Sequence, residues 1–348
     1  CGKVTVPDEK VWATDNAIVL SSTDCNYEYL AYCLKSMPLE NLIKQTAQPL
    51  LTASSLMNCY IPSPTLNEQN QIVYYLNSKC AVIDQAIQKQ TDIAEKLKDY
   101  RKSVITQAVT KGIDSTAETQ EFNFLWLKEI PRNWGIYKLN HILDLNHPYP
   151  LGDGDHGSIK AKDYVTNGIP LLRVQNLGYA EPIKKENMVY ISAKQNETIK
   201  NSTLRPNDIL FAKTGATIGK TAIITEEMPI ANTTSHIGKI TVDTNKFYPR
   251  YIYYFMSSEV GNFQLWSIAG KKATRPEVGL DEVRYIKFLV PKSIEEQEQI
   301  AKYLDSKCSK IDQAIQRSNK IIQKLEEYKK ALIYNAVTGK IDCRGEVK

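Results

Sequence analysis

Apolar residues recur in two long stretches of the chain, with steps that alternate between four and three positions. A mean step of about 3.5 residues is that of an a/d seam and predicts two long helices of the coiled-coil kind. The predicted seam residues are Ile72, Leu76, Ile83, Ile87, Leu97 and Val104 in the first stretch, and Ile300, Leu304, Ile311, Ile315, Ile322, Leu325 and Leu332 in the second. Because a single helix cannot bury its own apolar stripe, we expect the two helices to pack on each other as an antiparallel coiled coil.

The two stretches are copies of one sequence, 228 residues apart. The segment EQNQIVYYLNSKCAVIDQAIQ at 68–88 returns as EQEQIAKYLDSKCSKIDQAIQ at 296–316. Over the whole repeat, 66–114 and 294–342 are identical at 26 of 49 positions. Solenoid repeats have periods of about 20–50 residues, so this spacing indicates a duplicated module rather than a repeat array. Each copy of the helix follows a different globular segment.

Two seam positions are polar in both copies, where Gln90 matches Ser318 and Arg101 matches Lys329. Polar residues inside a seam commonly fix the register and the partner of a coiled coil. A helix of about 43 residues spans about 65 Å, so the predicted pair would form a rod of fixed length.

The segment between the helices predicts a strand-rich domain. Short runs rich in β-branched and aromatic residues, broken by turn signals, lie at 165–174, 205–225 and 237–242. Helical spacing occurs at 248–265, and the run at 283–291 predicts a last strand that leads into the second helix. The expected fold class is therefore α+β, with mixed strand-rich domains alternating with two long helices.

The first sixty residues have the pattern of the closing part of a sister domain. The tyrosine-bearing segment NYEYLAYCLKSM at 26–37 predicts a helix that corresponds to the start of 248–265. By the repeat offset, the counterpart of Phe122 would fall roughly a hundred residues before residue 1. We therefore expect a first domain that lacks its opening part in this sequence. The predicted order is the end of a first domain at 1–64, a long helix at 65–114, a linker at 115–121, a second domain at 122–292, a long helix at 293–342 and a tail at 343–348.

The composition is that of a globular chain, with 42% hydrophobic and 24% charged residues, and no run approaches the ~18 apolar residues of a membrane helix. The formal net charge is +5, and the segment 122–290 holds all of this excess, with 21 Lys and Arg against 16 Asp and Glu. This is a weak indication of a polyanionic partner. The seven cysteines form no CxxC pair, which disfavours a zinc site and is typical of a reducing cytoplasm.

No catalytic or metal site is predicted. The segment TGATIGKT at 214–221 resembles a phosphate-binding loop, but Thr214 stands where the motif needs its first glycine, so we expect a glycine hairpin rather than an ATP site. The histidines are scattered without ligand spacing. The segment GDGDHG at 152–157 lacks the spacing of a calcium loop and is predicted to be a loop. Its glycines would alternatively let the backbone approach DNA closely.

DNA recognition requires amides and bidentate donors at base edges, with Lys and Arg on phosphates. The candidates on predicted loops are Lys160, Lys162, Arg173, Gln175, Asn176, Lys213, Lys220, Lys271, Lys272 and Arg275. Arg173 and Gln175 alternate on a predicted strand and would therefore share one face. For each candidate the alternative is a solvated surface side chain.

The chain resembles the specificity subunits of type I restriction-modification systems. The resemblance rests on the paired EQxQI…YL…SKC…ID helices, on the IPxxW segment at Ile130–Trp134, and on the runs at 164–177 and 205–220. It covers nearly the whole chain except for the missing front of the first domain. The resemblance implies two target-recognition domains that read a bipartite DNA site, and two long helices that fix the gap between its halves.

The same resemblance implies the partners and the cofactors. Two methyltransferase subunits would dock on the long helices and use S-adenosylmethionine to methylate adenine, and restriction subunits would supply ATP- and Mg-dependent translocation and cleavage. This chain would be a non-catalytic, cytoplasmic subunit without a cofactor of its own. Two other hypotheses stay open: a coiled-coil scaffold whose globular domain binds protein or glycan, and an enzyme that uses a nucleotide at 214–221.

Overall fold

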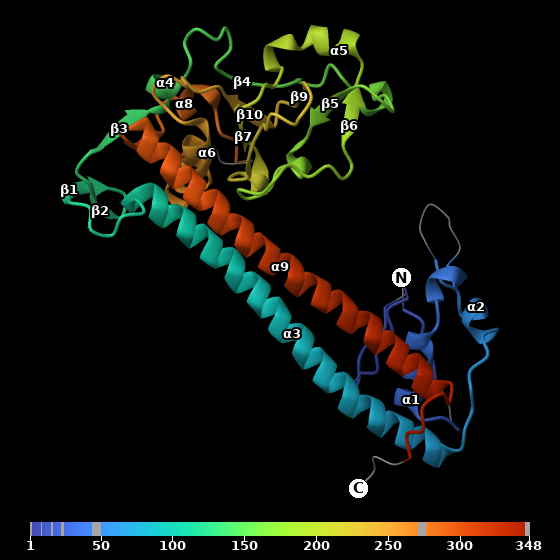
Figure 1. Cartoon of the computed structure of the whole chain (residues 1–348). Helices are drawn as coiled ribbons and strands as arrows, with labels where there is room; N and C mark the ends of the chain where they lie inside the picture. The colour runs from blue at the N-terminus through green and yellow to red at the C-terminus, as the bar shows by residue number, and fades with distance from the viewer. Residues whose placement is uncertain are drawn as a thin grey trace. The chain divides into compact units, whose positions relative to one another are not determined.

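The structure, a computed structural model, describes residues 2–7, 9–14, 17–21, 24–43, 50–270 and 276–344. Its contacts divide the chain into two compact units, each of which contains part of both long helices (Figure 1). Unit 1 comprises Cys1–Leu97 with Gln313–Lys348, and unit 2 comprises Lys98–Asp312. The predicted domains are consecutive along the chain, whereas the observed units join distant segments because each unit pairs one end of the first helix with one end of the second.

The two long helices are α3, Leu66–Lys111, and α9, Ile294–Val337, so the prediction of two long helices is confirmed. A capping box starts α3, because Glu68 Oε2 accepts from the backbone N–H of Thr65 while Thr65 Oγ1 accepts from that of Glu68. Glycines follow the ends of both helices, Gly112 with φ 78° and Gly339 with φ 73°. Glycine adopts this left-handed conformation without steric cost, so it stops a helix readily.

The regular elements in the described part of unit 1 are helices, and the described residues between 2 and 21 lie outside any helix or strand. Its elements are α1 (Tyr27–Ser36), the 3-10 helix η1 (Leu39–Leu42), α2 (Ala53–Met57), the first part of α3 and the last part of α9. The tyrosine-bearing helix predicted at 26–37 is α1, and Asn26 caps it by accepting from the backbone N–H groups of Glu28 and Tyr29.

The core of unit 1 joins the start of α3 to the end of α9. Leu76 and Cys80 of α3 are buried in one cluster with Leu332 and Ala336 of α9 and with Tyr29 of α1. Because the beginning of one helix meets the end of the other, the two helices are antiparallel here.

Unit 2 contains every strand in the described part of the chain. The strands are β1 (Thr119–Phe124), β2 (Leu127–Pro131), β3 (Trp134–Lys138), β4 (Leu151–Asp153), β5 (Ile169–Leu172), β6 (Val189–Ile191), β7 (Ile209–Ala212), β8 (Thr221–Ile223), β9 (Asn232–Thr233), β10 (Ile237–Ile240) and β11 (Lys287–Pro291). The helices are α4 (Leu139–Ile142), α5 (Ala193–Thr198), α6 (Pro249–Ser257), α7 (Glu259–Ala269) and α8 (Leu280–Val283), with 3-10 turns η2 (Ala161–Asp163), η3 (Val174–Asn176), η4 (Lys200–Ser202) and η5 (Gly215–Thr217).

These strands form several small sheets rather than one large sheet. A four-stranded antiparallel sheet has the order β4-β10-β7-β8, and a three-stranded sheet has the order β6-β5-β9 with β5 and β9 parallel. The pairs β1-β2 and β11-β3 complete the set, and β11-β3 lies where the chain enters α9 (Figure 1). The strand-rich character predicted for 122–292 is therefore observed, on short strands.

Two predicted elements of unit 2 divide differently in the structure. The helical pattern at 248–265 breaks at Ser258, whose hydroxyl accepts from the backbone N–H of Gly261 and starts α7 as a separate helix. The strand expected over 283–291 begins only at Lys287, because α8 extends through Val283. In both cases a local cap or turn interrupts a continuous apolar pattern.

One helix anchor occurs in both units. The buried Tyr29 of α1 donates its hydroxyl to Pro62 O at 3.0 Å and Val337 O at 3.4 Å. The buried Tyr251 of α6 donates in the same way to Leu289 O at 2.8 Å and Val109 O at 3.3 Å. Each tyrosine thus ties the segment that enters one long helix to the end of the other long helix.

Further contacts of the anchor are repeated. Gln69 Oε1 accepts from the backbone N–H of Asn26, the N-cap residue of α1, at 2.9 Å. Gln297, its counterpart 228 residues later, accepts from that of Tyr248, the N-cap residue of α6, at 2.8 Å. The duplication seen in the helix sequences therefore extends to α1 and α6, which share little sequence beyond their tyrosines.

Candidate nucleic-acid interface

The predicted seam residues line the helix pairing in both units. Ile300 and Leu304 of α9 share the core of unit 2 with Val104 of α3, and all three are at most 8% exposed. The remaining predicted seam residues are buried or half-buried; these are Ile72, Leu76, Ile83, Ile87, Leu97, Ile311, Ile315, Ile322, Leu325 and Leu332. The outward faces of the helices carry the charged residues.

Among the DNA-binding candidates, Lys160 and Lys162 lie exposed at the 3-10 turn η2. The turn is held by Asp163, whose carboxylate accepts from the backbone N–H of Lys160 at 2.9 Å. Gln195 of α5 also donates to Asp163 O at 2.9 Å and connects the turn to the rest of the domain. Both ammonium groups therefore project from a fixed backbone, as a phosphate contact requires.

Arg173 and Gln175 do not alternate on a strand, so that prediction is wrong. The strand β5 ends at Leu172, and the next residues form the 3-10 turn η3 because Asn176 Oδ1 accepts from the backbone N–H of Arg173. Both side chains nevertheless reach one acceptor: Arg173 Nη2 donates to Asn187 O at 2.7 Å and Gln175 Nε2 donates to it at 3.4 Å. They hold the segment before β6 in place.

Asn176 is a structural residue. Its side chain is completely buried, and its amide donates to Lys184 O at 2.9 Å and to Glu186 O at 3.4 Å. All of its hydrogen-bonding capacity is directed into the protein, so it presents nothing to a base edge.

Lys213 is also directed inward. It is 5% exposed, and its ammonium group pairs with the carboxylate of Asp153 in the segment predicted as a loop. Lys220 lies half-buried at the end of the connection between β7 and β8. That connection leads into strand β8 and not into a helix, so it lacks the helix N-terminus on which a phosphate-binding loop relies.

Lys271, Lys272 and Arg275 lie outside the described residues. The segment that follows them is well anchored, because Gly215 donates its backbone N–H to Pro276 O and Val278 donates to Lys213 O, both at 2.9 Å. Pro276 and Val278 are therefore held beside η5 and the end of β7.

The prediction of a loop at 152–157 holds only for its second part, because Gly152 and Asp153 lie in strand β4. Asp155 organises the turn that follows. Burial opposes the charged form of this carboxylate, but hydrogen bonds from the Ser158 hydroxyl and from the backbone N–H groups of Ile159, Gly157 and Ser158 outweigh it and lower the pKa of Asp155. Gly154 allows a close backbone approach, but to the protein itself: a Cβ there would lie 1.8 Å from Thr233 O. The glycine serves the packing of this loop on β9.

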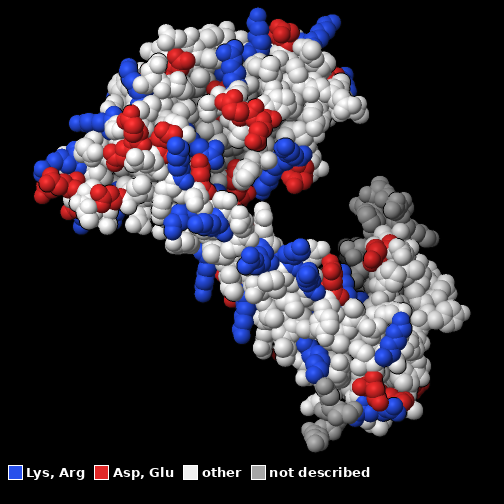
Figure 2. All heavy atoms as spheres, in the orientation of Figure 1, with Lys and Arg blue, Asp and Glu red and all other residues white. Residues whose placement is uncertain are grey.

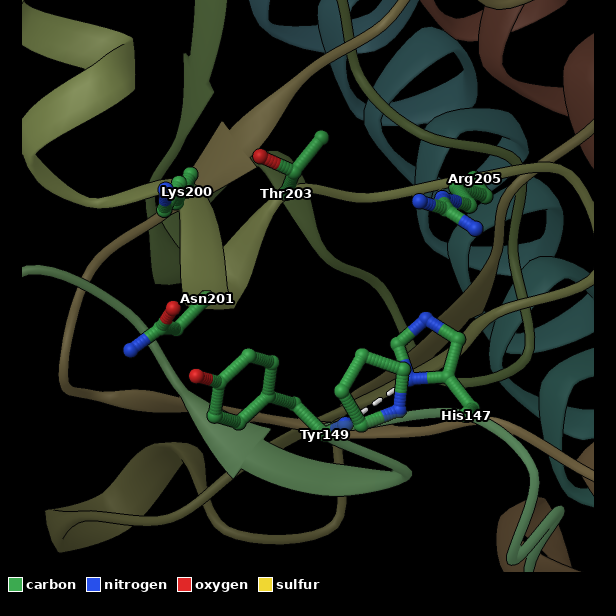
Figure 3. A pocket seen from close by; sticks show the side chains of 7 residues that line it. His147, Tyr149, Lys200, Asn201, Thr203 and Arg205 are labelled. Carbon is green, nitrogen blue, oxygen red and sulfur yellow. Dashed lines mark hydrogen bonds between the residues drawn. The ribbon is translucent and has the colours of Figure 1, made fainter.

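Unit 2 also contains a hollow of about 310 Å³ that the sequence did not predict (Figure 3). Its lining residues are His147, Pro148, Tyr149, Lys200, Asn201, Thr203 and Arg205. They come from the loop after α4 and from the segment around η4, which are far apart in the chain. These residues meet only in the folded chain. The one signal in the sequence is that Lys200 and Arg205 flank a polar turn.

On the displayed face of unit 2, charged side chains of both signs are mixed. Figure 2 shows Lys and Arg interspersed with Asp and Glu on the face displayed.

Within the described residues, no group of three or more His, Cys, Asp or Glu side chains is arranged to hold a metal ion. In that same part of the chain, no helix combines the length and the hydropathy that crossing a membrane requires.

Comparison with known proteins gives relatives of one kind. The chain is 28% identical over 291 residues to the EcoBI type I restriction enzyme specificity subunit of Escherichia coli, covering 79% of this chain and 58% of that protein. It is 26% identical over 318 residues to the MjaVIII type I restriction enzyme specificity subunit of Methanocaldococcus jannaschii, covering 90% of this chain and 70% of that protein. The chain thus spans less than two thirds of the length of the Escherichia coli relative.

The fold has a counterpart among solved structures. A chain from a study of complex assembly and conformational transition of the type I R-M system superposes with a TM-score of 0.63 at 16% identity, covering 90% of this chain and 71% of the other. The family model described as the type I restriction modification DNA specificity domain matches residues 1–92 and 131–327. Since that match covers most of the sequence, the chain belongs to the type I restriction-modification DNA specificity family.

Proposed function

We propose that this chain recognises a bipartite DNA target as the specificity subunit of a type I restriction-modification complex. Membership of the DNA specificity family supports DNA recognition. Unit 2 would read one half of the target through exposed cations such as Lys160 and Lys162. The domain to which unit 1 belongs would read the other half.

The duplicated helix anchor is the observation that carries this proposal. Tyr29 in unit 1 makes the same two kinds of hydrogen bond as Tyr251 in unit 2, to the strand or loop that enters one helix and to the end of the other helix. A protein that attaches two domains to two helices by one repeated device is suited to present two reading heads. The continuous helices α3 and α9 would then set the gap between the half-sites.

The same duplication supports two equivalent docking places for methyltransferase subunits, because repeated surfaces bind repeated partners. The charged outer faces of α3 and α9 would provide these places. The methyltransferase subunits would supply S-adenosylmethionine and the restriction subunits would supply ATP and Mg²⁺. This chain would contribute no catalytic group, in accord with relatives that are named as specificity subunits.

Co-expression of the chain with its methyltransferase subunit, followed by genome-wide mapping of methylated adenine, tests the proposal. The expected result is one motif with two defined halves and a constant gap. Methylation of a single half-site or of its palindrome would show that unit 2 alone reads sequence and would refute the bipartite assignment. A stable complex without any methylation would contradict recognition by this chain, and the absence of a complex would contradict the docking of methyltransferase subunits.

A further inference from the structure

The hollow on unit 2 has a lining without acidic side chains. Its charged lining residues are Lys200 and Arg205, and the other members are aromatic, polar or proline. Figure 3 shows Tyr149 and Asn201 on one side of the space and Arg205 on the other, with Lys200 and Thr203 between them along the border. A concave site of this composition attracts anions.

The two cations of the hollow are free to bind a ligand. Within the described part of the chain, no hydrogen bond or ion pair joins the side chain of Lys200 or of Arg205 to another residue, and both residues are exposed. Other basic side chains of unit 2 are already engaged: Lys213 pairs with Asp153, and Arg250 lies 2.6 Å from Asp305. Lys200 and Arg205 thus keep their charge available to an anion, unlike Lys213 and Arg250.

A buried cation lies behind the wall of the hollow. Lys239 is 1% exposed, and its ammonium group has one long hydrogen bond, 3.5 Å to the backbone oxygen of Thr203, a lining residue. The nearby Asp208 is equally buried and accepts from the Thr241 hydroxyl at 2.5 Å and from the backbone N–H of Arg205 at 2.8 Å. Because the opposite charges of the buried Lys239 and Asp208 offset each other, the charge that the hollow presents to solvent is that of Lys200 and Arg205.

Two further groups suit a nucleotide. Tyr149 is 44% exposed, so its ring is available for contact with a sugar or a base. Its backbone N–H donates to His147 Nδ1 at 3.0 Å, which leaves the Nε2–H of a neutral His147 imidazole as a donor. Burial and the positive charges of Lys239 and Arg205 lower the pKa of His147, against the opposing effects of Asp208 and Asp144.

We propose that the hollow seats a phosphate of the DNA backbone, held by Lys200 and Arg205, with the Tyr149 ring against the adjoining sugar. The proposal deepens the proposed function and rests on it, because it assigns a sequence-independent contact within DNA recognition. Such a contact positions the domain on the duplex and leaves base reading to other residues.

The salt dependence of DNA binding tests the assignment. Fluorescence anisotropy would give the affinity of the full chain, co-purified with its methyltransferase subunits, for a target duplex and for an unrelated duplex at several salt concentrations. Loss of one phosphate contact lowers the slope of log K against log salt by about 1. We expect that decrease for Lys200→Gln and for Arg205→Gln on both duplexes. Lys128→Gln, which removes one exposed charge from β2, is the matched control and leaves the slope unchanged.

A second readout is the imidazole NMR signal of His147. The signal should shift when duplex is added to the wild-type protein and stay in place with Arg205→Gln, whose folding is checked by its unchanged unfolding midpoint. Unchanged slopes and an unmoved His147 signal, with wild-type binding intact, would overturn this site and spare the proposed function. A shift of the His147 signal produced by inorganic phosphate or AMP but not by duplex would show that the hollow does not bind a DNA phosphate. Absence of salt-dependent duplex binding in the wild-type protein would refute the proposed function itself.

Discussion

Arg101 of α3 and Asp312 of α9 form an ion pair inside unit 2, with Nε and Oδ1 2.9 Å apart. Their counterparts 228 residues away in the repeat are Lys329 and Asp84, and these two residues form an ion pair in unit 1 at 2.6 Å. Each pair joins one copy of the helix to the other copy, so the two pairs are related by the internal symmetry of the chain. The polar seam position thus acts as a register marker in both units.

The two pairs differ in burial and should differ in energy. The Arg101 side chain is 8% exposed and also donates to the backbone oxygens of Tyr179 and Ala180, whereas the Lys329 and Asp84 side chains are 28% and 56% exposed. We expect Arg101→Met to lower the free energy of unfolding by about 3 kcal/mol, because it leaves a partly buried carboxylate and two carbonyls unpaired. Lys329→Met should cost less than about 1 kcal/mol. Urea unfolding of both variants measures the difference, and equal losses would contradict the structural distinction.

Gly152, which lies in β4, and Gly154, which follows the strand, offer a paired test of how this segment packs. A Cβ at Gly154 would collide with the backbone of Thr233, whereas a Cβ at Gly152 meets nothing within 4 Å. Gly154→Ala should therefore destabilise the protein by about 2 kcal/mol or more, and Gly152→Ala should be nearly neutral. Thermal unfolding of the two variants checks this, and a stable Gly154→Ala protein would show that the loop does not pack on β9 as described.

Asp155 should make the stability of unit 2 dependent on pH. Its pKa is lowered in the folded state, so its stabilising contribution is complete above the unfolded pKa, near about 4, and is lost as the pH falls through the lower folded value. The free energy of unfolding of wild type minus that of Asp155→Asn should be constant from neutral pH to pH of about 5 and should shrink below about 4. Urea unfolding at a series of pH values gives this difference. A difference that grows on acidification would have the wrong sign for the proposed hydrogen bonds.

Asn176 and Lys162 should separate folding from DNA binding. Asn176→Ala removes a buried amide that satisfies backbone groups, and it should lower the free energy of unfolding by about 2 kcal/mol. Lys162→Ala should leave stability unchanged and weaken binding to all duplexes, with a salt slope smaller by about 1. Unfolding and anisotropy measurements on both variants decide the roles. A sequence-specific binding defect in a fully stable Asn176→Ala protein would instead show that Asn176 reads a base.

The helices were predictable because their signals are local and repeated. A seam of residues such as Leu76 and Leu304 follows from spacing along one stretch of chain, and the copy confirms the pattern within the sequence. The predicted helix stretches 65–114 and 293–342 run past the observed ends at Lys111 and Val337, and Gly112 and Gly339 beyond these ends adopt a backbone conformation that favours glycine. The break at Ser258 was not predictable, because a single hydroxyl cap decides it within an otherwise continuous apolar pattern.

The candidate DNA-binding residues were predictable only as a class. Lys160 and Lys213 have the same chemistry in the sequence, yet one is exposed on a turn and the other is buried against Asp153. The partner of Lys213 is 60 residues away in the chain, so only strand pairing brings the two together. Likewise, Tyr149 and Arg205 are distant in the chain, and only the tertiary structure brings them to the border of one hollow.

Periodicity along the chain was enough to predict the helices with their apolar seam and the strand-rich segment between them, and comparison of the two stretches showed that the helix is duplicated. Each of these depends on neighbours within a few turns or on a direct comparison of two stretches. The tertiary structure decided which cations remain free, where the anchors Tyr29 and Tyr251 attach, and that one surface of unit 2 is hollowed. Those properties depend on contacts between residues distant in sequence, whose geometry is set by packing and hydrogen bonding of the folded chain as a whole.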